Sequence, residues 1–174
     1  IEEDMFNKQL NPSCDDYVLL RCNWEMTVFK LLIRKLKRKL RKSATDILFK
    51  SPEGDDLNRF KDVCDSERSD KIFYLEDPTD PKTWYDAVRA FLEENKHKKH
   101  VVVTIDHIAL VRDIFGSKKT AMDTLIENIN MLKKEFVNVS FIILSQLNRD
   151  IENRTDIQNL APKRSDLYNS DTIF

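Results

Sequence analysis

Three polar residues closely follow apolar stretches of the sequence: Glu25, Asp106 and Gln146. Asp106 ends an aliphatic run, and a carboxylate in that position suits Mg²⁺, which prefers oxygen ligands and usually keeps several waters. Glu25 could hold and deprotonate a water molecule for attack on a phosphate. Gln146 could bond a phosphate oxygen and a loop backbone at once. Taken singly, each residue also has a simple structural interpretation, as a loop carboxylate, a glutamate in a first helical turn or a polar strand end.

The elements that would position these residues alternate between strands and helices. Predicted strands cover residues 17–22, 71–75, 100–106 and 139–145, and predicted helices cover 24–42, 55–64 and 118–136. A further helix is expected to begin at Pro81, with Asp80 as its N-cap. The alternation predicts an α/β fold with three layers, in which helices flank a parallel sheet. Ligands of such sheets bind beyond the carboxyl ends of the strands, where Glu25, Asp106 and Gln146 are expected.

The composition narrows the class of protein. A length of 174 residues with 41% hydrophobic content indicates a single folded domain, residues 1–174. The 29 basic and 30 acidic residues nearly cancel, so any nucleic-acid binding would need a local basic patch. Apolar runs are too short to span a membrane. The three cysteines are widely spaced, which indicates reduced thiols in a cytoplasmic protein rather than a disulfide framework or a zinc cluster.

Other common site patterns are missing from the sequence. The two glycines, Gly54 and Gly116, cannot form a Gly-rich phosphate loop. The three histidines share no metal-ligand spacing, and neither a GxSxG nor an HExxH motif occurs. The strongest basic run, residues 34–42, could contact phosphates, an acidic partner or only water.

Four segments, in order along the chain, resemble the RecA-like ATPase domain of hexameric replicative helicases of the DnaB type: residues 22–26, 101–107, 141–149 and 163–171. In that family an aliphatic strand ending in Asp-Tyr forms the Walker B element, and here His107 replaces the tyrosine. The next family motif, Ser-Gln-Leu-Asn-Arg, is present without change at residues 145–149. The first segment resembles the family's Ser-Leu-Glu-Met element, and the last is similar to its Ser-Asp-Leu-Arg-Glu-Ser-Gly segment.

The resemblance implies a motor that couples NTP hydrolysis to translocation on single-stranded DNA and to duplex unwinding. Its cofactors would be ATP and Mg²⁺. Asp106 would bind Mg²⁺ through water, Glu25 would polarise the attacking water, and Gln146 would sense the γ-phosphate. The family also implies a homo-oligomeric ring, typically a hexamer, with a primase or a helicase loader as a further partner. The setting would be the cytoplasm of a bacterial or phage-infected cell.

The resemblance also implies a set of residues near single-stranded DNA: Arg149, Lys163, Arg164, Tyr168 and Asn169. The three basic side chains could supply positive charge to the DNA backbone. Tyr168 and Asn169 stand where the family has arginine and glutamate, so the usual contacts differ here. Tyr168 could instead stack on a base, because aromatic stacking tolerates any sequence.

Two parts of the family pattern are not found in these residues. The Walker A loop should precede the strand at 17–22, and residues 1–16 contain nothing like it. An arginine finger and a further strand should follow residue 174. We therefore expect a RecA-like core that is incomplete at both ends, is inactive as an ATPase by itself and belongs to an active parent protein. The alternatives are a RecA-like binding or assembly module that lost its P-loop, or a related recombinase-type ATPase.

Overall fold

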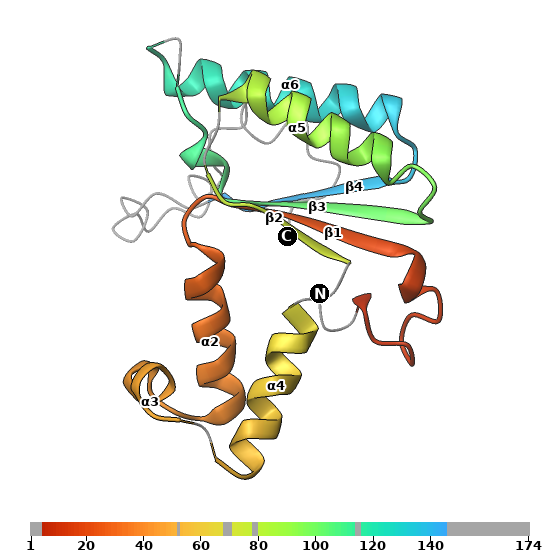
Figure 1. Ribbon diagram of the computed structural model, residues 1–174. Helices are drawn as coiled ribbons and strands as arrows, with labels where there is room; N and C mark the ends of the chain where they lie inside the picture. The colour runs from red at the N-terminus through yellow and green to blue at the C-terminus, as the bar shows by residue number, and fades with distance from the viewer. Residues whose placement is uncertain (1–4, 52, 68–70, 78–79, 114–115, 146–174) are drawn as a thin grey trace, which may run out of the picture.

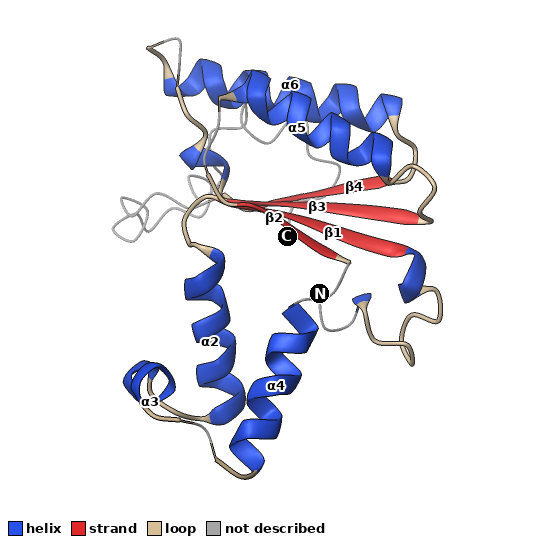
Figure 2. Ribbon diagram, in the orientation of Figure 1, coloured by secondary structure: helices blue, strands red, loops and turns tan. Residues whose placement is uncertain are grey.

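The computed structural model describes residues 5–51, 53–67, 71–77, 80–113 and 116–145, which form a parallel sheet and its flanking helices (Figures 1 and 2). The strands are β1 (Tyr17–Asn23), β2 (Ile72–Leu75), β3 (His100–Asp106) and β4 (Val139–Ile143). They form a four-stranded sheet in the order β2-β1-β3-β4, and every neighbouring pair is parallel. The predicted parallel α/β fold is therefore confirmed.

The described part of the chain also contains five α-helices and two short 3₁₀ turns. The helices are α2 (Val28–Leu40), α3 (Ala44–Phe49), α4 (Asp55–Glu67), α5 (Pro81–Glu94) and α6 (Lys118–Glu135). The 3₁₀ turns are η1 (Cys14–Asp16) and η2 (Ile108–Leu110). Among the described residues, none of these helices is both long and apolar enough to cross a membrane.

Helices α5 and α6 cover one face of the sheet (Figure 1). The core between these two helices and the sheet is apolar. It includes Val18, Leu20, Cys22, Val101, Val103, Ile105, Trp84, Val88, Leu125 and Ile129. Because side chains alternate along a strand, Leu19 and Val102 leave the opposite face. Both are buried as well. The central strands are therefore apolar almost throughout, as expected of strands covered on both faces.

Helices α2, α3 and α4 lie on the other side of the sheet and extend away from it (Figure 1). They pack around a second apolar cluster, with Leu36, Leu40 and Val63 at its centre. The apolar stripe of α2 faces α4 within this cluster. This explains how α2 can leave the sheet and carry its basic residues outward.

The boundaries of α2 differ from the predicted helix at 24–42. Thr27 is the N-cap, and its side chain accepts a hydrogen bond from the Lys30 backbone N–H, so residues 24–26 form a bend instead of a first helical turn. The helix ends at Leu40, and its C-cap Arg41 adopts a left-handed conformation with φ of 54°. Ser43 then caps α3 by accepting from the Asp46 N–H, and this short helix was not predicted.

The start of α5 agrees with the sequence. The Asp80 side chain accepts hydrogen bonds from the backbone N–H groups of Lys82 and Thr83, both at 3.0 Å. Pro81 occupies the first turn, where its missing N–H costs nothing. This cap fixes the direction in which the chain leaves the carboxyl edge of β2 and returns across the sheet.

Candidate functional site

Strands β1 and β3 end together at one edge of the sheet, on the left in Figure 1. Their last residues, Asn23 and Asp106, are register partners. The backbone N–H of Trp24 then donates to the Asp106 carbonyl oxygen at 3.0 Å. Glu25 is the next residue and is exposed, while Asp106 is half-buried. The structure therefore brings two of the three predicted site residues, Glu25 and Asp106, to the same edge.

The chain leaving β4 reaches this edge too. The Leu144 N–H donates to the Ile105 carbonyl at 2.9 Å, and the Ile108 N–H donates to the Leu144 carbonyl at 3.0 Å. Ser145 follows directly and is the last described residue. Six predicted site residues lie outside the described residues: Gln146, Arg149, Lys163, Arg164, Tyr168 and Asn169.

The bend that carries Glu25 is fastened at both ends. At its start, Trp24 is bonded to Asp106 as described above. At its end, Glu76, which follows β2, accepts a hydrogen bond from the Val28 N–H through Oε1 at 3.0 Å. A carboxylate at a helix N-terminus is favoured by the helix dipole. Contacts from both neighbours of β1 thus define where Glu25 lies.

Three buried side-chain nitrogens in the described part of the chain have no hydrogen-bond partner, and all three belong to this edge: Asn23 Nδ2, Trp24 Nε1 and His107 Nδ1. Buried polar atoms in proteins are nearly always hydrogen-bonded, so such a concentration needs an explanation. Strained or ligand-dependent polar groups are typical of functional sites. Asn23 was not singled out from the sequence, although its position as a polar strand end beside Glu25 was a usable signal.

The donor set at this edge suits a magnesium ion better than a zinc ion. Asp106 offers a half-buried carboxylate at the end of an apolar strand. Within the described ranges, no group of three or more His, Cys, Asp and Glu side chains could hold a metal by itself. A single carboxylate is typical of Mg²⁺ sites, where water and phosphate oxygens supply the other ligands.

The family model for the DnaB-like helicase C terminal domain matches residues 6–174. The chain belongs to this family. Two solved structures share its fold with a TM-score of 0.67 and 21% sequence identity over 91% of the chain. One is described as "The Structure Of A DnaB-Like Replicative Helicase And Its Interactions With Primase", and the other as an "ATPase Domain". The chain spans 38% of the first structure's chain and 56% of the second's. Among curated proteins, none matches.

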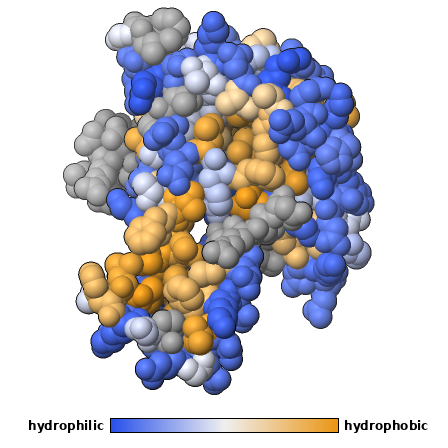
Figure 3. All heavy atoms as spheres, in the orientation of Figure 1, coloured by the Kyte–Doolittle hydropathy of each residue, from blue (hydrophilic) through white to orange (hydrophobic). Residues whose placement is uncertain are grey.

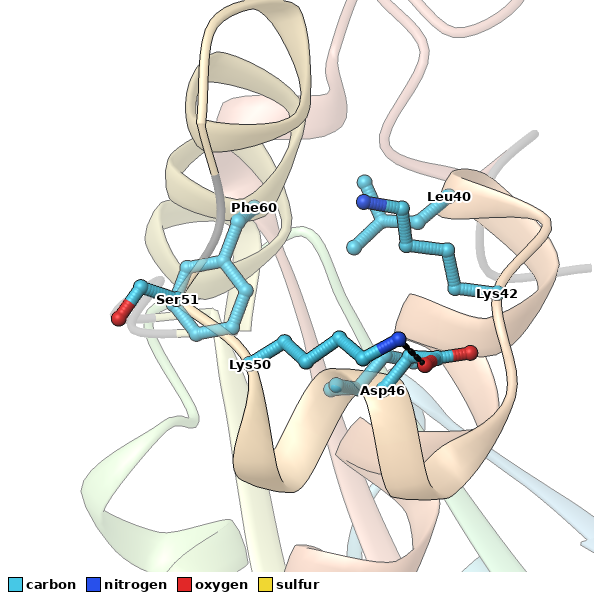
Figure 4. A pocket seen from close by; sticks show the side chains of 7 residues that line it. Leu40, Lys42, Asp46, Lys50, Ser51 and Phe60 are labelled. Carbon is cyan, nitrogen blue, oxygen red and sulfur yellow. Dashed lines mark ion pairs between the residues drawn. The ribbon is translucent and has the colours of Figure 1, made fainter.

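A shallow hollow in this DnaB-like domain lies where α2, α3 and α4 meet, at the end of α2 far from Asp106 (Figure 4). On the α3 side of the hollow, the Lys50 ammonium pairs with the Asp46 carboxylate at 2.7 Å. Hydrogen bonds from Lys50 and Ser43 lower the pKa of Asp46 to about 2. Lys42 of the basic run pairs with Asp56 of α4. The first two contacts stabilise α3 itself, and the Lys42–Asp56 pair joins the end of the basic run to α4. None of the predicted site residues lines the hollow.

Proposed function

We propose that this DnaB-like domain is part of the motor of an ATP-dependent replicative DNA helicase. The observation that supports this most directly is the shared position of Glu25 and Asp106, linked by the Trp24–Asp106 backbone hydrogen bond. Two carboxylates at the carboxyl edge of a parallel sheet are placed where such folds bind their ligands. One is half-buried and the other exposed, which fits two different tasks.

In this proposal the two carboxylates and Gln146 divide the work. Asp106 binds Mg²⁺ through water, and the metal, when bound, neutralises charge on the ATP phosphates. Glu25 orients and polarises the attacking water, which its exposed position on a fastened bend allows. Gln146 bonds to the γ-phosphate. This contact couples the presence of the γ-phosphate to the conformation of the segment that follows Gln146.

Single-stranded DNA would be gripped by the segment that follows Gln146. Arg149, Lys163 and Arg164 would contact phosphates, with Tyr168 stacking on a base and Asn169 making a polar contact. The formal net charge of the chain is −1, so these cations would form the local patch that binding requires. Nucleotide-dependent movement of this segment would translocate the strand and unwind the duplex.

A homo-oligomeric ring, with six subunits as in the family pattern, completes the proposal. Exposed apolar side chains on α2 and α3 support it, because a contiguous exposed apolar patch is typical of a protein–protein interaction site. Phe29, Leu48 and Phe49 are exposed by 59%, 47% and 81%, and the apolar surface over these helices is visible in the lower part of Figure 3. A primase or a loader would be a further partner of the ring, in the cytoplasm of a bacterial or phage-infected cell.

The decisive experiment measures ATP turnover and strand separation by the full-length protein, with and without single-stranded DNA. The motor predicts Mg²⁺-dependent turnover that single-stranded DNA stimulates, and unwinding of a forked duplex. The single domain of residues 1–174, measured beside it, should turn over little ATP. If the full-length protein showed neither ATP turnover nor strand separation, the result would instead support a RecA-like assembly module.

A further inference from the structure

Asn23 ends β1 at the level where Asp106 ends β3. The residues before them, Cys22 and Ile105, both belong to the core beneath α5 and α6. Because side chains alternate along a strand, those of Asn23 and Asp106 both leave the opposite face of the sheet. Neighbouring strands lie about 4.8 Å apart, so an amide and a carboxylate at these positions are within reach of a mutual hydrogen bond.

Asn23 differs in its hydrogen bonding from Asn128, the other buried asparagine in the described residues. Asn23 and Asn128 are each 8% exposed. Asn128 Nδ2 donates to the Pro81 carbonyl at 2.8 Å, whereas Asn23 Nδ2 is buried without a partner. An apolar residue of similar size would fill the same space without a buried unpaired donor. The hydrogen bond to Pro81 therefore explains why Asn128 is buried, and no comparable contact explains the buried Nδ2 of Asn23.

We propose that Asn23 is a positioning residue for Asp106. Its Nδ2 donates to the Asp106 carboxylate when magnesium and nucleotide are bound, and this contact fixes the direction in which the carboxylate faces the metal. The inference rests on the proposed function, since it requires Asp106 to serve magnesium. Hydrogen-bonded partners of ligating carboxylates commonly control their orientation and the affinity for the metal. The terminal torsion of an asparagine side chain is soft, so reorienting the amide toward Asp106 costs little energy.

The two other unpartnered nitrogens at the edge do not share this relation to Asp106. The Trp24 indole packs into the core beneath α5 and α6, on the opposite side of the sheet. His107 lies beyond the end of β3, immediately before η2. Asn23 is the one of the three that is paired with Asp106 in the strand register.

The test uses the full-length protein and a fluorescent ATP analogue. Nucleotide binding is titrated with Mg²⁺ for the unmodified protein and for Asn23→Leu, Asn128→Leu and Asp106→Asn. Asn23→Ala is measured in parallel, so that a poor fit of the larger side chain does not decide the result. Thermal unfolding of each variant is recorded, and bound Mn²⁺ is followed by electron paramagnetic resonance.

Both Asn23 variants should need roughly 10-fold more Mg²⁺ for half-maximal nucleotide binding, with weaker Mn²⁺ binding and unchanged affinity for nucleotide in EDTA. Asn128→Leu should lower thermal stability and leave the Mg²⁺ requirement unchanged. A normal Mg²⁺ requirement in both Asn23 variants, with a raised one in Asp106→Asn, would overturn this inference and leave the proposed function intact. Absence of Mg²⁺-dependent nucleotide binding in the unmodified protein would contradict both.

Discussion

The Trp24 backbone N–H donates to the Asp106 carbonyl oxygen across 3.0 Å. This bond continues the β1–β3 ladder by one step beyond the last register pair, Asn23 and Asp106. It holds the bend that carries Glu25 against the strand that carries Asp106. Two residues more than 80 positions apart in sequence, Trp24 and Asp106, are thus joined by a main-chain contact that does not depend on side-chain identity.

The N-cap of α5 gives a prediction about stability. Asp80→Ala should lower the free energy of unfolding by about 1 kcal/mol, because two backbone N–H groups lose their acceptor. Urea denaturation followed by circular dichroism measures the difference. Asp86→Ala, on an exposed position of the same helix, is the matched control and should cost little. Equal stability of the two variants would contradict the capping role.

The Asp80 cap also predicts a pH dependence. Hydrogen bonds from Thr83 lower the pKa of the Asp80 carboxyl below its ordinary value of 3.8. A lowered pKa in the folded state contributes stability that is complete above the ordinary value and is lost as the pH falls through the folded value. The stability difference between the unmodified protein and Asp80→Ala should therefore be constant at neutral pH and shrink below pH 3.8.

The cysteines should differ in reactivity. Burial raises the pKa of the Cys22 thiol to about 12, although the Trp84 indole N–H donates to its sulfur at 3.3 Å. Cys14 is also buried, and Cys64 is partly exposed. At pH 8 a disulfide reagent should label Cys64 rapidly and the other two thiols only after unfolding, because the thiolate is the reactive form and access is required. Loss of the rapid phase in Cys64→Ser checks the assignment, and rapid labelling of Cys22 in the folded protein would contradict it.

The proposed DNA contacts predict a change in salt dependence. Substituting both Lys163 and Arg164 by alanine in the full-length protein should flatten the log–log slope of single-stranded DNA binding against salt by roughly 1.4, since each phosphate contact contributes about 0.7. Lys96→Ala combined with Lys98→Ala removes the same charge just before the start of β3, at the edge of the sheet away from Asp106, and serves as the control. An unchanged slope in the first variant would exclude those two residues from the DNA contact.

The sequence was most informative where apolar runs end abruptly. The polar residues after residues 17–22 and 100–105 mark strand ends, and in a parallel sheet such ends lie at one edge. This local rule is enough to predict that Glu25 and Asp106 lie together. The start of α5 was equally predictable, because Asp80 followed by Pro81 is a local capping signal.

The features that were not predicted depend on contacts between distant segments. Asn23 becomes notable only once the register pairs it with Asp106 and burial leaves its Nδ2 unpaired. The role of Glu76 likewise depends on a hydrogen bond to Val28, 48 positions away. Helix α3 was missed because its cap at Ser43 follows a basic run that reads as one continuous helix. The predicted roles of Gln146 and of the DNA-contacting residues remain predictions.

ATP turnover by the full-length Glu25→Gln variant tests the central claim most directly, namely that Glu25 and Asp106 face one nucleotide. Glutamine keeps the shape of the side chain and removes its ability to accept a proton. Glu94→Gln, an exposed residue at the end of α5, is the control. We predict a fall in turnover of roughly 100-fold or more for Glu25→Gln, with nucleotide affinity kept and the control unaffected. Turnover equal to that of the unmodified protein would contradict the account.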